Sequence, residues 1–134
     1  MQLTIHYYNL VEIKKCEFGE VRHLASLASK AHVSVQATAG TQWFSVSKND
    51  IIIGCGALMK KGGSIGRVKG IYIKDEYRGK GYGLKLTEAL IQDGRDKLCT
   101  GIDLYTWHPE FWKKHGYRII GKNVHGALRF YKGI

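Results

Sequence analysis

The residues best suited to chemistry form one short stretch, RGKGYG at positions 78–83, which combines three glycines with two cations. The apolar run Ile71-Tyr72-Ile73 precedes it, and apolar residues at helical spacing follow from Leu84 to Leu98. A strand that enters a helix through such a turn can hold an anion, because converging amides and the helix dipole attract negative charge. The stretch lacks the spacing of a P-loop or of a dinucleotide fingerprint. It therefore predicts a phosphate-binding turn, with an ordinary tight turn as the alternative in a chain of 17 glycines.

The charge distribution points to the same half of the chain. The 134 residues carry a formal net charge of +10. Residues 1–59 hold five Lys/Arg against four Asp/Glu, whereas residues 60–134 hold sixteen against seven. The excess predicts a polyanionic partner near the glycine-rich turn, either a phosphate-rich small molecule or a nucleic acid.

The elements that must position this turn alternate between strands and helices. Period-2 and period-3.6 patterns predict strands at 3–10, 43–47, 51–59, 65–73, 102–107, 117–120 and 127–131, and helices at 21–31, 84–98 and 109–115. The order predicts an α+β, mixed three-layer fold in a single domain spanning 1–134. The longest apolar run is too short to cross a bilayer and the first ten residues lack a secretion-signal pattern, so we expect a cytoplasmic protein without a membrane segment.

The cysteines and histidines do not indicate a metal site. The three cysteines never form C-x-x-C, and they are expected to be reduced and mostly buried. The six histidines show no spacing typical of metal ligands. We therefore expect neither a metal nor a disulfide framework.

Two separated motifs resemble one known family. The segment IYIKDEYRGKGYGLKLTEAL, residues 71–90, looks like the acyl-CoA-binding motif of the GNAT superfamily of N-acetyltransferases. The segment FWKKHGYRIIG, residues 111–121, resembles that family's later F-Y-x-K-x-G-F motif. The resemblance implies a GNAT-like fold whose mostly antiparallel central sheet is splayed at the cofactor site. It also implies transfer of an acetyl group from acetyl-CoA, the co-substrate, to an amine of a small molecule, peptide or protein.

The resemblance further implies where the cofactor lies. The pyrophosphate would bind the backbone amides of Gly79, Lys80, Gly81, Tyr82 and Gly83, with Arg78 at the family's Arg/Gln position. The pantetheine arm would run along Ile71, Tyr72 and Ile73, which requires an open strand edge. Lys113 is a candidate for the nucleotide end, with a solvated helix face as the alternative.

The residues expected to move protons depart from the family's pattern. The strand position that often carries a glutamate is Arg67, and the common tyrosine acid is Trp112. His108 and Tyr105, at or just beyond the end of a strand facing the cofactor, are the candidate base and acid, against a surface histidine and a sheet-face tyrosine. Direct attack through ordered water is the other route. Trp107 and Trp112 bracket the acceptor side and are the candidate substrate contacts.

Other interpretations stay open at this point. A nucleic-acid-binding module, or an enzyme that modifies nucleic acid or charged tRNA, would also explain the +10 charge. The absence of a carboxylate cluster argues against a polycationic acceptor and favours a neutral or anionic one. A second apolar stripe on the long helix, Leu84, Ile91 and Leu98, predicts either cover from the amino-terminal segment in a monomer or a homodimer contact.

Overall fold

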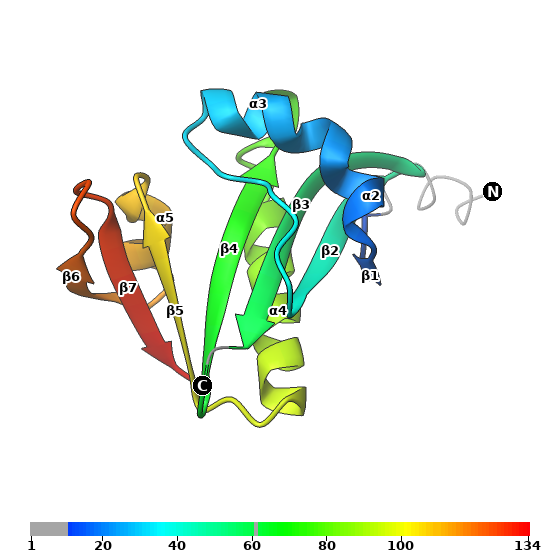
Figure 1. The fold of residues 1–134 in the computed structure, drawn as a ribbon. Coiled ribbons are helices and arrows are strands. Elements are labelled where there is room, and N and C mark those ends of the chain that lie inside the picture. Colours follow the sequence, from blue (N-terminus) through cyan, green and yellow to red (C-terminus); the bar gives the residue numbers. More distant parts are fainter. Residues whose placement is uncertain (1–10, 61) are drawn as a thin grey trace.

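The computed structural model describes residues 11–60 and 62–134. One sheet of seven strands runs through these residues in the order β1-β2-β3-β4-β5-β7-β6 (Figure 1). Its strands are β1 (Val11–Cys16), β2 (Thr41–Lys48), β3 (Ile51–Lys60), β4 (Ile65–Ile73), β5 (Gly101–Thr106), β6 (Arg118–Lys122) and β7 (Leu128–Gly133). The helices are α2 (Phe18–Val21), η1 (Arg22–Leu24), α3 (Ala25–Lys30), η2 (Asp75–Tyr77), α4 (Tyr82–Asp96) and α5 (Pro109–Lys114).

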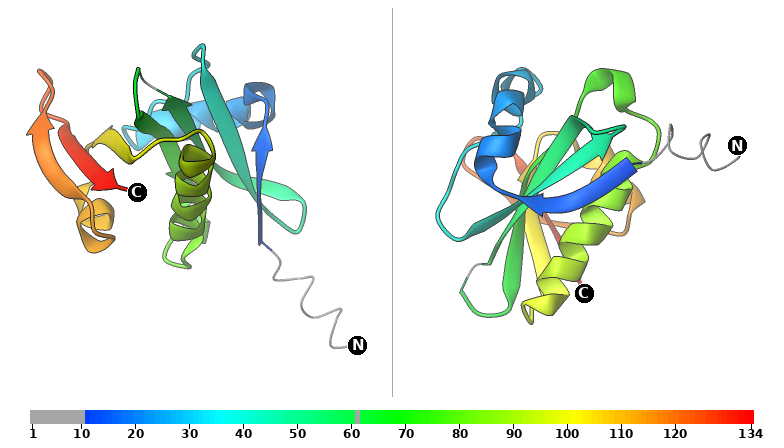
Figure 2. Two further views of the ribbon diagram at one scale, coloured as in Figure 1. Left: turned by 90° about the horizontal axis from the view of Figure 1, so that it is seen from below. Right: turned by 90° about the vertical axis from the view of Figure 1, so that its right-hand side faces the viewer.

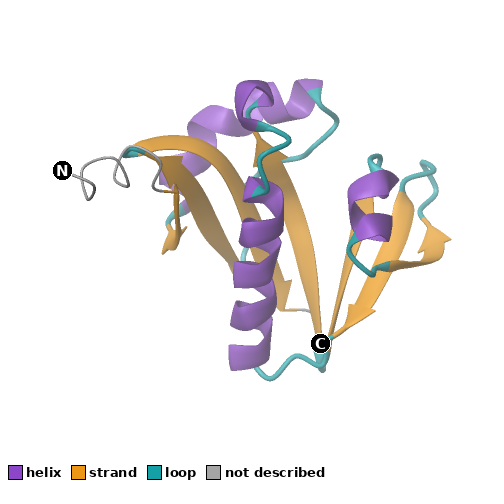
Figure 3. Ribbon diagram, turned by 180° about the vertical axis from the view of Figure 1, so that it is seen from behind, coloured by secondary structure: helices purple, strands orange, loops and turns teal. Residues whose placement is uncertain are grey.

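The sheet is the middle of three layers. Helices α4 and α5 lie on one face, and α2, η1 and α3 lie on the other (Figures 2 and 3). Under α4 the core contains Leu58, Leu86, Ile102 and Phe130, all at most 1% exposed. Under α2 and α3 a second core surrounds Trp43. The predicted α+β three-layer fold with a mostly antiparallel sheet is therefore confirmed.

The hairpin and meander at the centre of the sheet form as the sequence predicts. Asn49 and Asp50 have positive φ values of 50° and 67°, and Lys48 pairs with Ile51 across them. Asn and Asp tolerate this left-handed conformation, which gives the two-residue turn a twist that suits antiparallel strands. Strand β4 then pairs antiparallel with β3, which places the residues before the glycine-rich turn in the middle of the sheet.

Several boundaries differ from the prediction. The predicted strand 3–10 lies outside the described residues, whereas β1 was missed because its lysines and glutamate hide the alternation of a half-exposed strand. Helix α4 begins at Tyr82, because Gly81 in the left-handed conformation is its N-cap. It ends at Asp96, and Leu98 with φ 65° turns the chain out of the helix before β5.

Strand β1 accounts for part of the second apolar stripe on α4. Ile91 is 9% exposed, and Val11 and Ile13 of β1 pack against the same core. Lys15 of β1 also lies 3.2 Å from Asp93 of α4. The amino-terminal side of the chain thus covers this stripe at Ile91, while Leu98 is 80% exposed.

The sheet opens between its two central strands. Strands β4 and β5 are parallel and pair at only three positions, from Ile65 with Gly101 to Arg67 with Asp103. Beyond Arg67 they diverge, and β5 continues in register with β7 (Figure 1). The expected splay is confirmed, and it leaves the second half of β4 without a neighbour on its β5 side. No helix in the described ranges is both long and apolar enough to span a bilayer.

Candidate functional site

The glycine-rich turn leaves its backbone open to a ligand. Gly79 and Gly81 have φ values of 77° and 83°, so both need the conformational freedom of glycine. A Cβ built on either residue would meet no protein atom within 4 Å. The chain's own packing therefore does not fill the space above the turn.

The first amides of α4 face this open space. The N–H of Lys85 donates to the carbonyl of Gly81 at 3.2 Å, which begins the helical bonding. The amides before it, Tyr82, Gly83 and Leu84, have no acceptor within the helix, and no side chain caps Gly81. Together with the helix dipole, these amides have the arrangement that the predicted anion cradle requires.

The cations around the cradle come from two parts of the chain. Lys80 is exposed within the turn itself. Lys48 comes from the end of β2 and lies 6.0 Å and 5.8 Å from the ring centroids of Tyr77 and Tyr82. Sequence reasoning missed Lys48, because the hairpin that brings it here is more than thirty residues away in the chain.

The side chain of Arg78 supports the turn. Its Nε donates to the carbonyl of Ile73 at 2.8 Å, and its Nη1 lies 2.8 Å from Oδ1 of Asp75. The guanidinium also lies over the Tyr72 ring, 5.3 Å from its centroid. Arg78 thus ties the end of β4 to the turn while about half of its side chain stays exposed.

A bulge interrupts the pairing of β4 with β3. Cys55 pairs with Tyr72 and Ala57 with Lys69, so two steps on β3 oppose three on β4. Gly70 in this bulge has a φ of 64°, and a Cβ there would lie 2.6 Å from the Trp43 ring. The expected pantetheine residues, Ile71, Tyr72 and Ile73, follow the bulge directly and lie beyond the last β4–β5 pair.

Charged side chains meet where the two strands part. Arg67 of β4 donates to Asp103 of β5 through Nε to Oδ1 at 3.1 Å and through Nη2 to Oδ2 at 2.9 Å. Arg129 of β7 donates to the same Oδ2 through Nε at 3.1 Å and Nη2 at 2.7 Å. The carboxylate is 0% exposed, and these hydrogen bonds raise the pKa of Arg129. We call Arg67, Asp103, Arg129 and Tyr105 the apex cluster.

Tyr105 completes the apex cluster. Its ring centroid lies 4.9 Å from the guanidinium carbon of Arg67 and 5.9 Å from that of Arg129. Tyr105 is 40% exposed, so the candidate acid lies at the surface of the apex. Sequence reasoning found Tyr105 but missed Asp103, whose only signal is one acid inside the apolar run of β5.

Two side-chain hydrogen bonds, from His108 and from Lys69 of β4, hold the loop at residues 31–40 in place. His108 shares a 2.7 Å hydrogen bond between its Nε2 and the carbonyl of Ala31. Because a carbonyl only accepts, Nε2 is the donor and the lone pair of a neutral His108 lies on Nδ1. Lys69 donates to Oγ1 of Thr38 at 2.6 Å, and burial, then Arg67, lowers the pKa of Lys69. His108 thus tethers the loop as well as standing at the end of β5.

The remaining candidates separate into exposed and buried positions. Trp107 is 50% exposed, whereas Trp112 is 5% exposed and packs edge to face against Tyr117 at 5.0 Å. This position favours a core role for Trp112 over the expected substrate contact. Lys113 lies on α5, and its Nζ is 3.9 Å from Oε1 of Glu110. Its side chain is half exposed, so it remains available to solvent.

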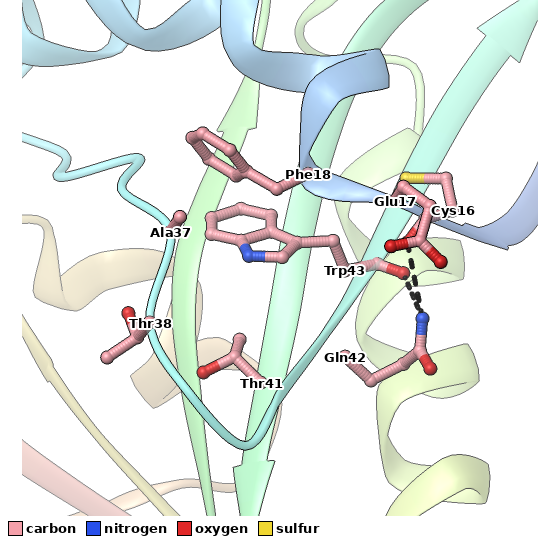
Figure 4. A pocket seen from close by; sticks show the side chains of 8 residues that line it. All are labelled: Cys16, Glu17, Phe18, Ala37, Thr38, Thr41, Gln42 and Trp43. Atoms are coloured by element: carbon pink, nitrogen blue, oxygen red, sulfur yellow. Dashed lines mark hydrogen bonds between the residues drawn. The ribbon is translucent and has the colours of Figure 1, made fainter.

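A cavity of about 390 Å³ lies beside α2 and the 31–40 loop (Figure 4). Phe18 and Trp43, which both line it, contact each other edge to face with their ring centroids 5.2 Å apart. Two polar atoms of residues that line the cavity are buried without a hydrogen-bond partner in the described structure: Trp43 Nε1 and Thr41 Oγ1. None of the predicted cofactor or acid-base residues lines it, so this cavity is separate from the glycine turn and the apex cluster.

The thiols are unsuited to nucleophilic work. Burial raises the pKa of Cys55 to about 12, and burial with Glu20 nearby raises that of Cys16 to about 11. Cys99 is buried as well. At neutral pH Cys16 and Cys55 stay protonated, which removes the reactive thiolate. The described part of the chain, residues 11–60 and 62–134, holds no group of three potential metal ligands.

Comparisons with known proteins agree on one family. Residues 39–119 match the family model described as an acetyltransferase (GNAT) domain. An amino-acid acetyltransferase of Mycobacterium tuberculosis is 28% identical over 69 residues, which is 52% of this chain. The match spans only 40% of that curated relative's length.

Solved structures show the same fold. N-acetylglutamate synthase from Neisseria gonorrhoeae, complexed with coenzyme A and L-arginine, superimposes with a TM-score of 0.79 at 14% identity, covering 94% of this chain and 34% of that one. PaiA N-acetyltransferase from Thermoplasma acidophilum, in complex with coenzyme A, gives a TM-score of 0.74 at 14% identity, covering 93% and 99%. At these identities the similarity establishes the fold alone.

Proposed function

Since the chain belongs to the GNAT acetyltransferase family, we propose that it is an acetyl-CoA-dependent N-acetyltransferase acting on an amine. One observation carries this proposal: the open edge of β4 is followed, after the short helix η2, by an uncapped glycine turn at the start of α4. An extended thioester arm can pair with such an edge while its pyrophosphate lies on the amides of the turn. Both features are needed by one ligand, and they adjoin in the fold.

The cofactor contacts follow from this arrangement. Gly79 to Gly83 supply main-chain donors for the pyrophosphate, and Lys80 and Lys48 supply countercharge around it. Ile71, Tyr72 and Ile73 supply the edge for the pantetheine arm. Arg78 holds the turn in shape by capping the Ile73 carbonyl. Lys113 on α5 is an exposed contact for the nucleotide end.

The transfer proceeds by direct attack within a ternary complex. The amine nitrogen forms a bond to the thioester carbonyl carbon, the C–S bond breaks, and the products are an amide and the thiol of CoA. The amine's proton passes to Nδ1 of His108 or to ordered water, and the thiolate gains a proton from the Tyr105 hydroxyl or water. The raised pKa values of Cys16 and Cys55 argue against an acetyl-cysteine intermediate.

Thermal unfolding with acetyl-CoA tests the proposal. A ligand at one hundred times its Kd stabilises the folded state by about 2.7 kcal/mol, so the melting temperature should rise by several degrees. Acetyl-CoA should also lose its acetyl group in the presence of an amine, followed as free CoA thiol. No rise in melting temperature at millimolar acetyl-CoA would exclude the proposed cofactor.

The nucleic-acid alternative makes a different prediction. The relatives named above are acetyltransferases, which favours the enzyme over a binding module. CoA is itself strongly anionic and accounts for a basic surface beside the turn. Binding to a DNA or RNA duplex that weakens steeply with salt and persists in saturating acetyl-CoA would support the alternative instead.

A further inference from the structure

We propose that Arg67 and Arg129 bind a carboxylate on the acceptor, so that the enzyme acetylates small amines that also carry a carboxylate, such as amino acids. This inference rests on the proposed function, because it names the substrate of the same site. It is argued from the geometry and charge of the apex cluster.

The apex cluster lies where an acceptor must approach. Arg67 and Asp103 form the last pair before β4 and β5 diverge, so these two residues lie at the closed end of the opening. The thioester is expected on the β4 edge that begins immediately beyond this pair. A substrate held at Arg67 and Arg129 can therefore direct its amine along the opening toward the thioester.

The charges at the apex favour an anion. Arg67, Arg129 and the nearby Lys69 are cations, and Asp103 is the carboxylate that both guanidinium groups contact. Asp103 is 0% exposed, whereas the side chains of Arg67 and Arg129 are 22% and 35% exposed. The positive charge thus reaches the surface while the negative charge is buried beneath it.

The guanidinium groups also retain donors for a ligand. The hydrogen bonds to Asp103 use Nε and Nη2 of each arginine. A guanidinium has five N–H donors, so the Nη1 group of each arginine remains to contact a second carboxylate. Two fixed guanidinium groups suit the planar, two-oxygen geometry of a carboxylate better than a single mobile ammonium does.

The buried Asp103 fixes both arginines in place. Each guanidinium makes two hydrogen bonds to it, and each also lies against the ring of Tyr105. Prior fixation lowers the entropy lost when the substrate binds. The competing explanation is that the cluster only joins β4, β5 and β7, and this explanation predicts no preference for charged acceptors.

Matched acceptors on the wild-type protein decide between the two. Each proteinogenic amino acid is compared with its carboxamide at saturating acetyl-CoA, with release of CoA thiol as the readout. At least one amino acid should exceed its carboxamide in kcat/KM by about tenfold or more, the effect of one charge-assisted contact. Equal rates for the members of every pair, or no turnover with any amino acid, would overturn the inference.

A phosphonate arm distinguishes the kind of anion. The aminophosphonate analogue of the best amino acid is assayed alongside it. A carboxylate site should favour the amino acid, and a higher kcat/KM for the phosphonate would overturn the assignment to carboxylates.

Arginine variants separate binding from a purely structural role. Arg129→Gln should raise KM for the amino acid about tenfold while leaving KM for its carboxamide within about twofold. Arg129→Lys should recover part of the preference, because charge remains but the fork is lost. Arg95→Gln, on the exposed face of α4, is the matched control and should change neither constant. Parallel losses for both acceptors in Arg129→Gln would indicate a structural role and overturn the inference.

The two proposals fail in different ways. If acetyl-CoA does not raise the melting temperature, the proposed function fails. If acetyl-CoA stabilises the protein and neutral amines are acetylated as well as their carboxylate partners, only the acceptor inference fails. Should Arg129→Gln not fold, the wild-type comparison of matched acceptors still gives the answer.

Discussion

The two ends of β4 differ in the kind of groups they present: main-chain groups at one end and charged side chains at the other. At the end that enters the glycine turn, β4 has no neighbouring strand on its β5 side, and the glycines at 79 and 81 keep side chains out of the way. At the other end, Arg67, Asp103 and Arg129 meet through their side chains across three strands. A backbone site depends on conformation, whereas the apex cluster depends on compensating charges.

This difference determines how each end should respond to substitution. A change of backbone conformation at the turn should weaken ligand binding. It should leave the fold intact, because the fold does not depend on the ligand. A buried carboxylate between two cations is part of the fold, because removing it leaves charges without compensation. Substitutions at the turn should therefore affect binding, and those at the apex should affect stability as well.

The largest effect is expected from removing the buried carboxylate. Asp103→Ala should lower the free energy of unfolding by about 3–5 kcal/mol, because two guanidinium groups lose their shared partner. Asp75→Ala is the control at the other end of β4, since the Asp75 side chain is 82% exposed in its ion pair with Arg78. That pair should contribute about 1 kcal/mol or less. Urea unfolding measures both, and equal losses would remove the contrast between the two ends.

The next effect concerns the turn. Gly81→Glu places a side chain at a φ of 83° and a negative charge beside the expected pyrophosphate. Affinity for acetyl-CoA should fall at least about 100-fold, measured by calorimetry or by the shift in melting temperature. Gly63→Glu is the matched control, because Gly63 also has a positive φ and open space around it. If both variants lost acetyl-CoA equally, the turn would not be the binding site.

A smaller effect is expected at Arg78. Arg78→Gln removes the guanidinium that caps the Ile73 carbonyl, while the backbone of the turn remains. Affinity for acetyl-CoA should fall about tenfold, clearly less than in Gly81→Glu. A loss as large as that of Gly81→Glu would show that this side chain, rather than the main chain, holds the anion.

The smallest effect is expected on the neighbouring strand, at Cys55 of β3, which pairs with Tyr72 of β4. Its folded pKa of about 12 exceeds the ordinary value of 9.0, so the thiol stabilises the fold below pH 9 and loses this contribution as pH rises toward 12. The contribution of Cys55 to the free energy of unfolding should fall by about 1 kcal/mol between pH 9 and pH 10. Urea unfolding across this range measures it. Cys55→Ala should weaken the pH dependence, and an unchanged slope would contradict the burial argument.

The same contrast explains what the sequence could predict. The positive φ values at positions 79 and 81 favour glycine, so the residue types and spacing of RGKGYG are enough to predict a binding turn there. The meander from β2 to β4 could be predicted equally well from the sequence, because its turn at Asn49 and Asp50 depends on neighbouring residues. Both features depend on neighbours in the chain.

The apex cluster could not be found in this way. Its charged residues lie at positions 67, 103 and 129, and they meet only because β5 pairs with β4 on one side and β7 on the other. In the sequence, Arg67 only marks the absence of the glutamate that the family often has at this position. Asp103 is a single acid in a buried strand. The role of His108 as a tether to Ala31 was hidden for the same reason, since the contact joins residues 77 positions apart.

The three paired positions between β4 and β5 also have a mechanical consequence. These three pairs, which we call the spine, join two parts of the sheet: β1 to β4 on one side, and β5, β7 and β6 on the other. From Arg67 to Ile73 the lever arm is about 20 Å, given a rise of about 3.3 Å per residue, so a rotation of about 5° at the spine moves the far end by about 2 Å. That displacement is larger than the length of a carbon–carbon bond. Substitutions at the spine are therefore expected to change the width of the opening without contacting a ligand bound there.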